Sequence, residues 1–288
     1  MCRLFGTAAS APIDVSFELL EAENPLLDQS EQHDSGWGIA SYRHGQPVVR
    51  RFPQAAHSDP GFRSAADVAS ELVIAHVRRA TIGGLRLENT HPFAEDRFTY
   101  CHNGTIIEAD RLLERTDRRP KGDTDSERFF CLLMALLDPA DVVGSLRRTV
   151  EATCERCRFS ALNLLFSDGT RLYAYRFGLY EMFRLVRNLD LDADTRTHYH
   201  VHLERPHGEH VAMASSERLT EGEPWEPFGQ DELLICDPRD PDHPRIERLL
   251  GDGADSVEFE PFEPDRELAG AERGSWAAEQ ARAQLGRS

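Results

Sequence analysis

Short runs of apolar residues, some of them alternating with polar ones, recur along most of the chain, which is the pattern of β-strands. Residues 72–77 form a short apolar run, and residues 97–102 alternate. Asp168-Gly169 and Phe177-Gly178 are turn signals between later segments. Further strands are predicted over residues 159–166, 171–176, 182–186, 198–203, 210–214, 232–236 and 245–250.

Two segments near the middle of the chain carry the spacing of helices instead. In residues 125–137 the apolar residues recur every three or four positions, at Phe129, Leu132, Leu133 and Leu136. Residues 139–157 form a second helical segment, with Pro139 near its start. Helices placed between sets of strands predict a layered α+β domain.

The domain organisation follows from where these patterns stop. No linker divides the first 250 residues, so one domain is expected over residues 2–250. After Gly251 the chain becomes acidic and rich in Gly, Pro and Glu. We therefore predict a weakly ordered acidic tail over residues 251–288, with a short helix near residues 277–285.

Composition and charge restrict the possible partners. The 288 residues are 40% hydrophobic and 29% charged, with a formal net charge of −17. This acidity disfavours a nucleic acid or an anionic membrane as a partner. No apolar run approaches the roughly 20 residues that span a bilayer, and no signal-peptide pattern opens the chain. The expected location is the cytoplasm.

The cysteines and histidines predict no metal site and no cofactor. Six cysteines in a cytoplasmic chain are expected to be free thiols. Cys154 and Cys157 share one face of a predicted helix, which favours a structural role. Alternating histidines on the strand at 198–203 could face a metal, but the charged residues on either side favour a solvent-facing strand. The histidines in question are His198, His200, His202, His207 and His210.

Candidate chemistry begins at Cys2, directly behind Met1. Removal of Met1 would leave a thiol and a free α-amino group on one residue. An α-amino group titrates at about 7.7–8.0 and a thiol at about 8.5, so the amine can take the thiol proton near neutral pH. Taken alone, Cys2 is more simply read as a buried strand residue.

Three further segments each allow a functional and a structural interpretation. Residues 76–81 (HVRRAT) end a strand at two arginines, which could grip a carboxylate or only face solvent. Asn103-Gly104 is typical of a turn, and could also form an oxyanion hole. Thr124 and Glu127 fit a capping box, in which Asp125 would suit a first helical turn or could receive a substrate ammonium.

The combination and order of these segments resemble the class II glutamine amidotransferases of the N-terminal nucleophile hydrolase superfamily, most closely their short stand-alone members. Residues 34–39 (DSGWGI), 88–93 (ENTHPF) and 162–169 (LNLLFSDG) support the resemblance, which covers residues 2 to about 236. The resemblance implies a four-layer αββα sandwich with the nucleophile at the start of a central strand.

The resemblance also assigns roles by position. It implies that Cys2 is the nucleophile and that its freed amine is the base. Arg78, and not Arg79, matches the arginine that binds the substrate α-carboxylate. Asn103 and Gly104 match the oxyanion donors. A carboxylate at position 125 (Asp125) matches the group that receives the α-ammonium.

The remaining matched residues are expected to support this site. Thr81 would add a contact beside the carboxylate, while Trp37, Gly38, His91 and Pro92 would shape the site. The implied activity is cleavage of the γ-amide of glutamine or of another γ-glutamyl compound through a thioester, as in ergothioneine-type biosynthesis or glutathione-type peptide degradation. The alternative is a non-catalytic or ammonia-donating subunit of a separate synthase or peptidase complex.

Overall fold

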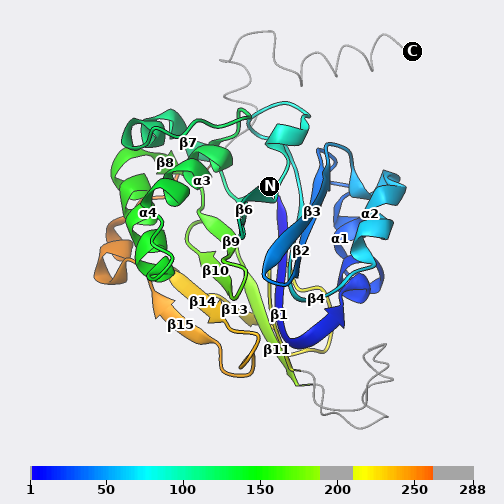
Figure 1. The fold of residues 1–288 in the computed structure, drawn as a ribbon. Coiled ribbons are helices and arrows are strands. Elements are labelled where there is room, and N and C mark those ends of the chain that lie inside the picture. Colours follow the sequence, from blue (N-terminus) through cyan, green and yellow to red (C-terminus); the bar gives the residue numbers. More distant parts are fainter. Residues whose placement is uncertain (1, 189–209, 262–288) are drawn as a thin grey trace, which may run out of the picture.

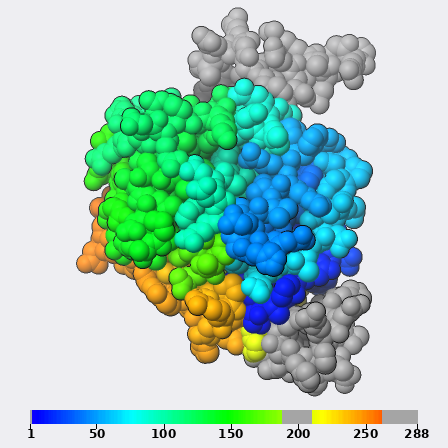
Figure 2. Space-filling model, viewed as in Figure 1, coloured from blue at the N-terminus to red at the C-terminus, as the bar shows by residue number. Residues whose placement is uncertain are grey.

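The structure, a computed structural model, describes residues 2–188 and 210–261. Two sheets lie face to face, and helices cover the outer face of each (Figure 1). Every pairing between neighbouring strands in these sheets is antiparallel. In the space-filling view the two halves meet in one continuous surface (Figure 2). The layered α+β architecture predicted from the sequence is confirmed.

The first sheet has seven strands in the order β13-β11-β12-β1-β4-β2-β3. Its two central strands, β1 and β4, pair with Arg3 opposite Val77, which places the start of β1 beside the end of β4. The strands are β1 (Arg3–Asp14), β2 (Trp37–Arg43), β3 (Gln46–Phe52), β4 (Ala69–Val77), β11 (Phe183–Asn188), β12 (His210–Ser215) and β13 (Glu226–Pro227).

The second sheet has six strands in the order β15-β14-β10-β9-β6-β5. They are β5 (Phe93–Glu95), β6 (Phe98–Asn103), β9 (Asn163–Ser167), β10 (Leu172–Arg176), β14 (Glu232–Cys236) and β15 (Arg245–Arg248). The strand predicted over residues 159–166 is split. Its first part, β8 (Arg158–Phe159), pairs with β7 (Ile106–Ile107), and Ala161 forms an isolated bridge with Gly178.

The helices form the two outer layers, together with several short turns of helix. Helix α3 (Asp125–Leu136) agrees with the prediction. Helix α4 (Val142–Arg156) begins later than predicted because the Asp141 side chain caps it, accepting from the Gly144 N–H at 2.9 Å. The others are η1 (Phe17–Glu21), α1 (Leu26–Gln29), η2 (Ala56–Ser58), α2 (Pro60–Ala66), η3 (Leu87–Asn89), η4 (Ala109–Arg115) and η5 (Gly251–Ser256).

Three apolar clusters hold the four layers together. Alternation along β1 sends Leu4 into the cluster between the sheets and Phe5 into the cluster beneath α1 and α2. A third cluster joins the six-stranded sheet to α3 and α4. Leu4 and Phe5 are both fully buried, and burial of such a side chain contributes about 1.5–3 kcal/mol to folding. The first strand is therefore fixed from both faces.

A buried cluster of charged side chains ties strand β11 of the seven-stranded sheet to helix η1 and to the segment around residue 223. Arg187 on β11 pairs with Glu18 at 2.7 Å and with Glu223 at 2.8 Å, and all three side chains are at most 9% exposed. Loss of one member of such a cluster leaves uncompensated charge in the interior.

The remaining predictions concern the end of the chain and the histidines. Of the predicted tail, residues 251–261 are described, and Phe259 packs against Phe159 and Phe177. The strand predicted at 198–203, four of the five histidines and residues 262–288 lie outside the described part, so the division at residue 250 stays a prediction. All six cysteines are free thiols. No helix among the described residues is long and apolar enough to span a membrane.

Candidate active site

The candidate nucleophile, Cys2, lies directly before β1. Alternation places its side chain on the same face as Leu4, toward the space between the sheets. The Cys2 thiol donates to the Arg79 carbonyl, with Sγ and O 3.6 Å apart. Burial raises the pKa of the Cys2 thiol, while the charge of the chain's amino terminus, the bond to Arg79 and the charge of Arg78 act in the opposite direction. The thiol is therefore protonated at neutral pH and needs a base.

Arg78 follows the last residue of β4 and is only 2% exposed. Its guanidinium donates to the carbonyl oxygens of residues 82–84 at 2.9–3.0 Å, so the loop after β4 folds around it. Burial lowers the pKa of Arg78, and the charge of Cys2 in its thiolate form and that of Asp125 counteract the effect. The guanidinium thus lies within electrostatic range of both groups.

Asn103 and Gly104 form the turn at the end of β6. Asn103 is 1% exposed, lies on the same face of the strand as Cys101 and so faces the inter-sheet space. Its Oδ1 is buried without a hydrogen-bond partner. A Cβ on Gly104 would lie 1.9 Å from the Ala161 carbonyl oxygen, so only glycine fits this close approach.

His102 holds this turn in place, a role that the sequence did not reveal. Its Nε2 lies 3.1 Å from the Ala161 carbonyl oxygen and its Nδ1 lies 2.9 Å from Ser126 Oγ. A carbonyl can only accept, so Nε2 carries the proton and Nδ1 accepts from Ser126. Burial lowers the pKa of His102, which keeps the ring neutral. The ring ties the Asn103-Gly104 turn to helix α3.

Asp125 is the first residue of α3 and is 5% exposed. Its Oδ2 accepts from the Ile106 N–H at 2.7 Å. Thr124 caps the helix as predicted, accepting from the Glu127 N–H at 3.2 Å. The capping box is not reciprocal, however, because the Glu127 carboxylate accepts instead from the N–H groups of residues 121 and 122. The cap fixes the carboxylate of Asp125 at the helix N-terminus.

Thr81 joins the loop after β4 to the turn after β6. Its Oγ1 accepts from the Thr105 hydroxyl at 3.4 Å, and the Thr105 N–H donates to Ser160 Oγ at 3.0 Å. Thr81 therefore lies between the loop that surrounds Arg78 and the segment that follows Asn103-Gly104.

The four residues expected to shape the site divide into two groups. Gly38 meets the segment His91-Pro92 so closely that a Cβ would lie 2.1 Å from the His91 carbonyl oxygen. Trp37, by contrast, points to the outer face, where its Nε1 donates to Asp59 at 2.8 Å and its ring packs edge-on against Phe62. Trp37 supports the sheet from outside the inter-sheet space.

The packing of His91 against a second buried histidine, His76, was not predicted from the sequence. The rings of His76 and His91 lie 4.3 Å apart, and both residues are at most 3% exposed. Burial lowers the pKa of His76 to about 3 and that of His91 well below its ordinary value. Two neutral rings thus pack in the interior, His76 two residues before Arg78.

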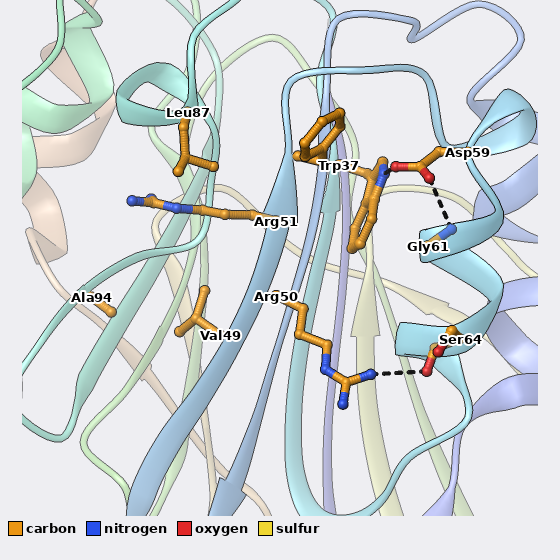
Figure 3. A pocket seen from close by; sticks show the side chains of 10 residues that line it. Trp37, Val49, Arg50, Arg51, Asp59, Gly61, Ser64, Leu87 and Ala94 are labelled. Carbon is orange, nitrogen blue, oxygen red and sulfur yellow. Dashed lines mark hydrogen bonds between the residues drawn. The ribbon is translucent and has the colours of Figure 1, made fainter.

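A hollow of about 720 Å³ lies beside strand β3 (Figure 3). Trp37, Arg50, Phe52 and Leu87 are among its lining residues, and none of the predicted catalytic or substrate-binding residues lines it. Arg51, another lining residue, links β3 to the segment that contains His91, because its guanidinium donates to the carbonyl oxygens of residues 90 and 92 at 2.7 and 2.9 Å.

Comparisons with known proteins agree with the geometry. A model of the family described as class-II glutamine amidotransferases matches residues 1–241. The protein named "Putative glutamine amidotransferase YafJ" of Escherichia coli K12 is 32% identical over 190 residues, which are 61% of this chain and 72% of that protein. The matches to the first three curated relatives cover 51% to 72% of their lengths.

Two solved structures are similar in fold. The structure of a predicted glutamine amidotransferase from Pseudomonas aeruginosa PA01 has a TM-score of 0.57 and 22% identity, covering 83% of this chain and 98% of that chain. The glutamine phosphoribosylpyrophosphate amidotransferase of Bacillus subtilis has a TM-score of 0.61 and 16% identity, covering 86% and 49%. These likenesses confirm the N-terminal nucleophile hydrolase sandwich predicted from the motifs.

Proposed function

Because the chain belongs to the class II glutamine amidotransferases, we propose that it cleaves the γ-amide of glutamine or of another γ-glutamyl compound through Cys2. One observation carries the proposal. Four separate segments carry the candidate groups: the residue before β1, the end of β4, the end of β6 and the start of α3. They contribute Cys2, Arg78, Asn103 and Asp125. The charges of Arg78 and Asp125 both act on the Cys2 thiol, which supports their lying near one another.

The γ-glutamyl head is bound by its zwitterionic end. A guanidinium has more N–H groups than the three contacts that Arg78 makes with residues 82–84, so donors remain for the substrate α-carboxylate. Asp125 uses Oδ2 for the Ile106 N–H and would present its charge to the α-ammonium. Fixing both groups holds the side-chain carbonyl over the Cys2 thiol and converts binding energy into orientation.

Acylation of Cys2 then proceeds in balanced steps. Once Met1 is removed, the α-amine takes the thiol proton, and the thiolate attacks the carbonyl carbon. Asn103 Nδ2 and the Gly104 N–H stabilise the oxyanion, each donor contributing about 2.7–4 kcal/mol. The carbon–nitrogen bond breaks, the ammonium returns its proton to the leaving nitrogen, and a γ-glutamyl thioester remains on Cys2.

Deacylation releases glutamate by the same groups. The amine takes a proton from water, which attacks the thioester carbonyl, and the same oxyanion donors stabilise the second tetrahedral intermediate. The carbon–sulfur bond breaks and the thiol regains its proton.

The released ammonia or amine defines the biological role. We infer that the chain either supplies ammonia to a separate synthase subunit or hydrolyses a γ-glutamyl conjugate. A panel of γ-glutamyl amides, including glutamine, assayed with the wild type and with Cys2→Ala tests the activity. Turnover by the wild type alone supports the proposal, whereas turnover that survives Cys2→Ala refutes it.

The state of the amino terminus distinguishes an enzyme from a non-catalytic subunit. Intact mass spectrometry of the purified protein is expected to show a chain that begins at Cys2. Retention of Met1, with no turnover of the panel, would favour the role of a binding subunit, because the amine would then be tied up in a peptide bond.

A further inference from the structure

We propose that Arg3 and Glu217 are positioning residues for Cys2, an ion pair that fixes the backbone of the nucleophile and balances the charge beside its α-amine. This inference rests on the proposed function, because it concerns the amine that takes the thiol proton, and it adds two residues to that site. Its starting point is the end of β12, which lies along the first residues of β1.

The end of β12 holds the backbone of Leu4 through side chains as well as through the sheet. Phe5 pairs with Ser215 where the ladder between the two strands ends. One residue further, the Leu4 N–H donates to Ser216 Oγ at 2.9 Å. The Leu4 carbonyl accepts from the Ser215 hydroxyl at 2.9 Å and from the Ser216 N–H at 3.1 Å. Both serines are at most 5% exposed, so this segment has a fixed position beside the start of β1.

Glu217 extends these contacts to the residue next to the nucleophile. Its Oε1 lies 2.9 Å from Arg3 Nη2, and its N–H donates to Ser215 Oγ at 3.4 Å. Arg3 Nη1 in turn donates to the Cys2 carbonyl at 3.4 Å. One guanidinium therefore joins Glu217 to the backbone of Cys2, and its planar fork makes both contacts at once.

These contacts matter because the proposed base and nucleophile both belong to the first residue of the processed chain. A terminal residue is poorly ordered unless other groups hold it. The Cys2 thiol contacts the Arg79 carbonyl, and the Cys2 carbonyl contacts Arg3. Loss of the second contact would free rotation of the Cys2 backbone and move the amine and the thiol together. A displacement of about 1 Å at such a site can lower the rate by about 10²-fold.

The ion pair also determines the charge that acts on the amine. The amine and the carbonyl that Arg3 contacts belong to one residue. The contacting nitrogen of the guanidinium therefore lies within about 7 Å of the amine nitrogen, given standard backbone dimensions. A cation at this distance disfavours the protonated amine and so favours the form that accepts the thiol proton. Glu217 offsets part of that effect.

Other charged groups around the nucleophile form a constant background for this effect. The charges of Arg78 and Asp125 act on the Cys2 thiol. Burial lowers the pKa of His33 to about 4, so its ring is neutral in the pH range of an assay. Arg79, like the arginine of the pair, acts on this ring. None of these groups is altered when one member of the pair is replaced.

The test measures kcat/KM as a function of pH at low ionic strength, for glutamine or for the γ-glutamyl amide of the panel that is hydrolysed best. Intact mass confirms that each variant begins at Cys2. The acid limb of the profile reports the amine of the free enzyme. Arg3→Gln removes a positive charge and should move this limb to higher pH by about 0.5 to 1 unit. Glu217→Gln removes a negative charge and should move it to lower pH by a smaller amount. Residues that act only through the fold would not shift the limb in opposite directions.

Further variants separate charge from position. Arg3→Lys keeps the charge but loses the fork, so the acid limb should stay near that of the wild type while kcat falls by roughly 3- to 10-fold. The double variant of Arg3→Gln and Glu217→Gln removes both charges, so its limb should return toward that of the wild type. Arg239→Gln, an equal charge change in the exposed ion pair with Asp237, should alter neither the limb nor kcat.

The outcomes separate this inference from the proposed function. Acid limbs that coincide for the wild type, Arg3→Gln and Glu217→Gln, or that shift in the same direction, overturn the role of the pair while leaving Cys2-dependent hydrolysis in place. The shift in Glu217→Gln decides alone if Arg3→Gln does not fold. Absence of Cys2-dependent hydrolysis by the wild type overturns the proposed function and this inference with it.

Discussion

The role of Asp125 allows the sharpest quantitative prediction. The substitution Asp125→Asn removes the negative charge that would face the substrate ammonium and keeps the side-chain shape. Its Oδ1 can still accept from the Ile106 N–H, which the carboxylate now does at 2.7 Å. The change from a charged to a neutral acceptor costs about 1 kcal/mol of stability, so the variant is expected to fold.

The expected loss of activity follows from burial. Asp125 is 5% exposed, and loss of one partner of a buried, hydrogen-bonded charge pair costs about 2–5 kcal/mol. At about 1.4 kcal/mol for each factor of ten, kcat/KM for glutamine should fall by roughly 30- to 4,000-fold. Asp123→Asn, the same charge change two residues earlier at a side chain that is 59% exposed, should alter kcat/KM by much less.

The assay uses glutaramate, which is glutamine without its α-amino group. The wild type should lose most of its efficiency on glutaramate, because glutaramate lacks the ammonium that we propose Asp125 binds. Asp125→Asn should cause little further loss on this substrate. A loss of the same factor on glutamine and on glutaramate would refute the reasoning, because it would show that Asp125 acts through the fold and not through the ammonium.

Three further outcomes test the supporting structure. Gly104→Ala should lower kcat by about 10²-fold or more, because its Cβ would meet the Ala161 carbonyl, whereas Gly253→Ala, with nothing within 4 Å, should not. The free energy of unfolding, measured with urea, should fall as the pH is lowered from about 6.5 toward 3, because His76 and His91 take up protons in the unfolded chain but stay neutral when buried in the folded protein. Each histidine contributes up to about 1.36 kcal/mol per pH unit. A free energy of unfolding that does not change over this pH range would contradict the burial of neutral rings. Arg187→Met should cost about 3–5 kcal/mol of stability by leaving two buried glutamates uncompensated; a loss below 1 kcal/mol would contradict it.

The sequence predicted those parts of the fold that local patterns encode. Helix α3 and strand β14 have nearly the predicted limits, because period and turn signals are properties of a few adjacent residues. Three of the four segments singled out, which contain Arg78, Asn103 and Asp125, lie where a strand ends or a helix begins, and Cys2 lies where a strand begins. The predicted strand 159–166 was wrong in its continuity. The strand is interrupted at Ala161, whose carbonyl oxygen accepts a hydrogen bond from His102 Nε2. The residues around Ala161 carry no local pattern that predicts this long-range contact.

The contacts inside the site escaped prediction for the same reason. His102 holds the Asn103-Gly104 turn through partners 24 and 59 residues away in the chain. The carbonyl groups that hold Arg78 belong to the backbone and have no side-chain signature. Trp37 lies in a matched motif, yet strand alternation sends it to the outer layer, away from its neighbour Gly38. A motif gives the residues, while the packing decides which face they occupy.

The central claim is that Cys2 becomes acylated by the γ-glutamyl group. The most direct measurement is a rapid acid quench of the processed protein mixed with excess glutamine, followed by intact-mass and peptide mass spectrometry. The account predicts a mass increase of one glutamyl group on the amino-terminal peptide, absent in Cys2→Ala and removed by hydroxylamine. Hydrolysis of glutamine without any adduct at Cys2 in the pre-steady state, or an adduct on another cysteine, would contradict it.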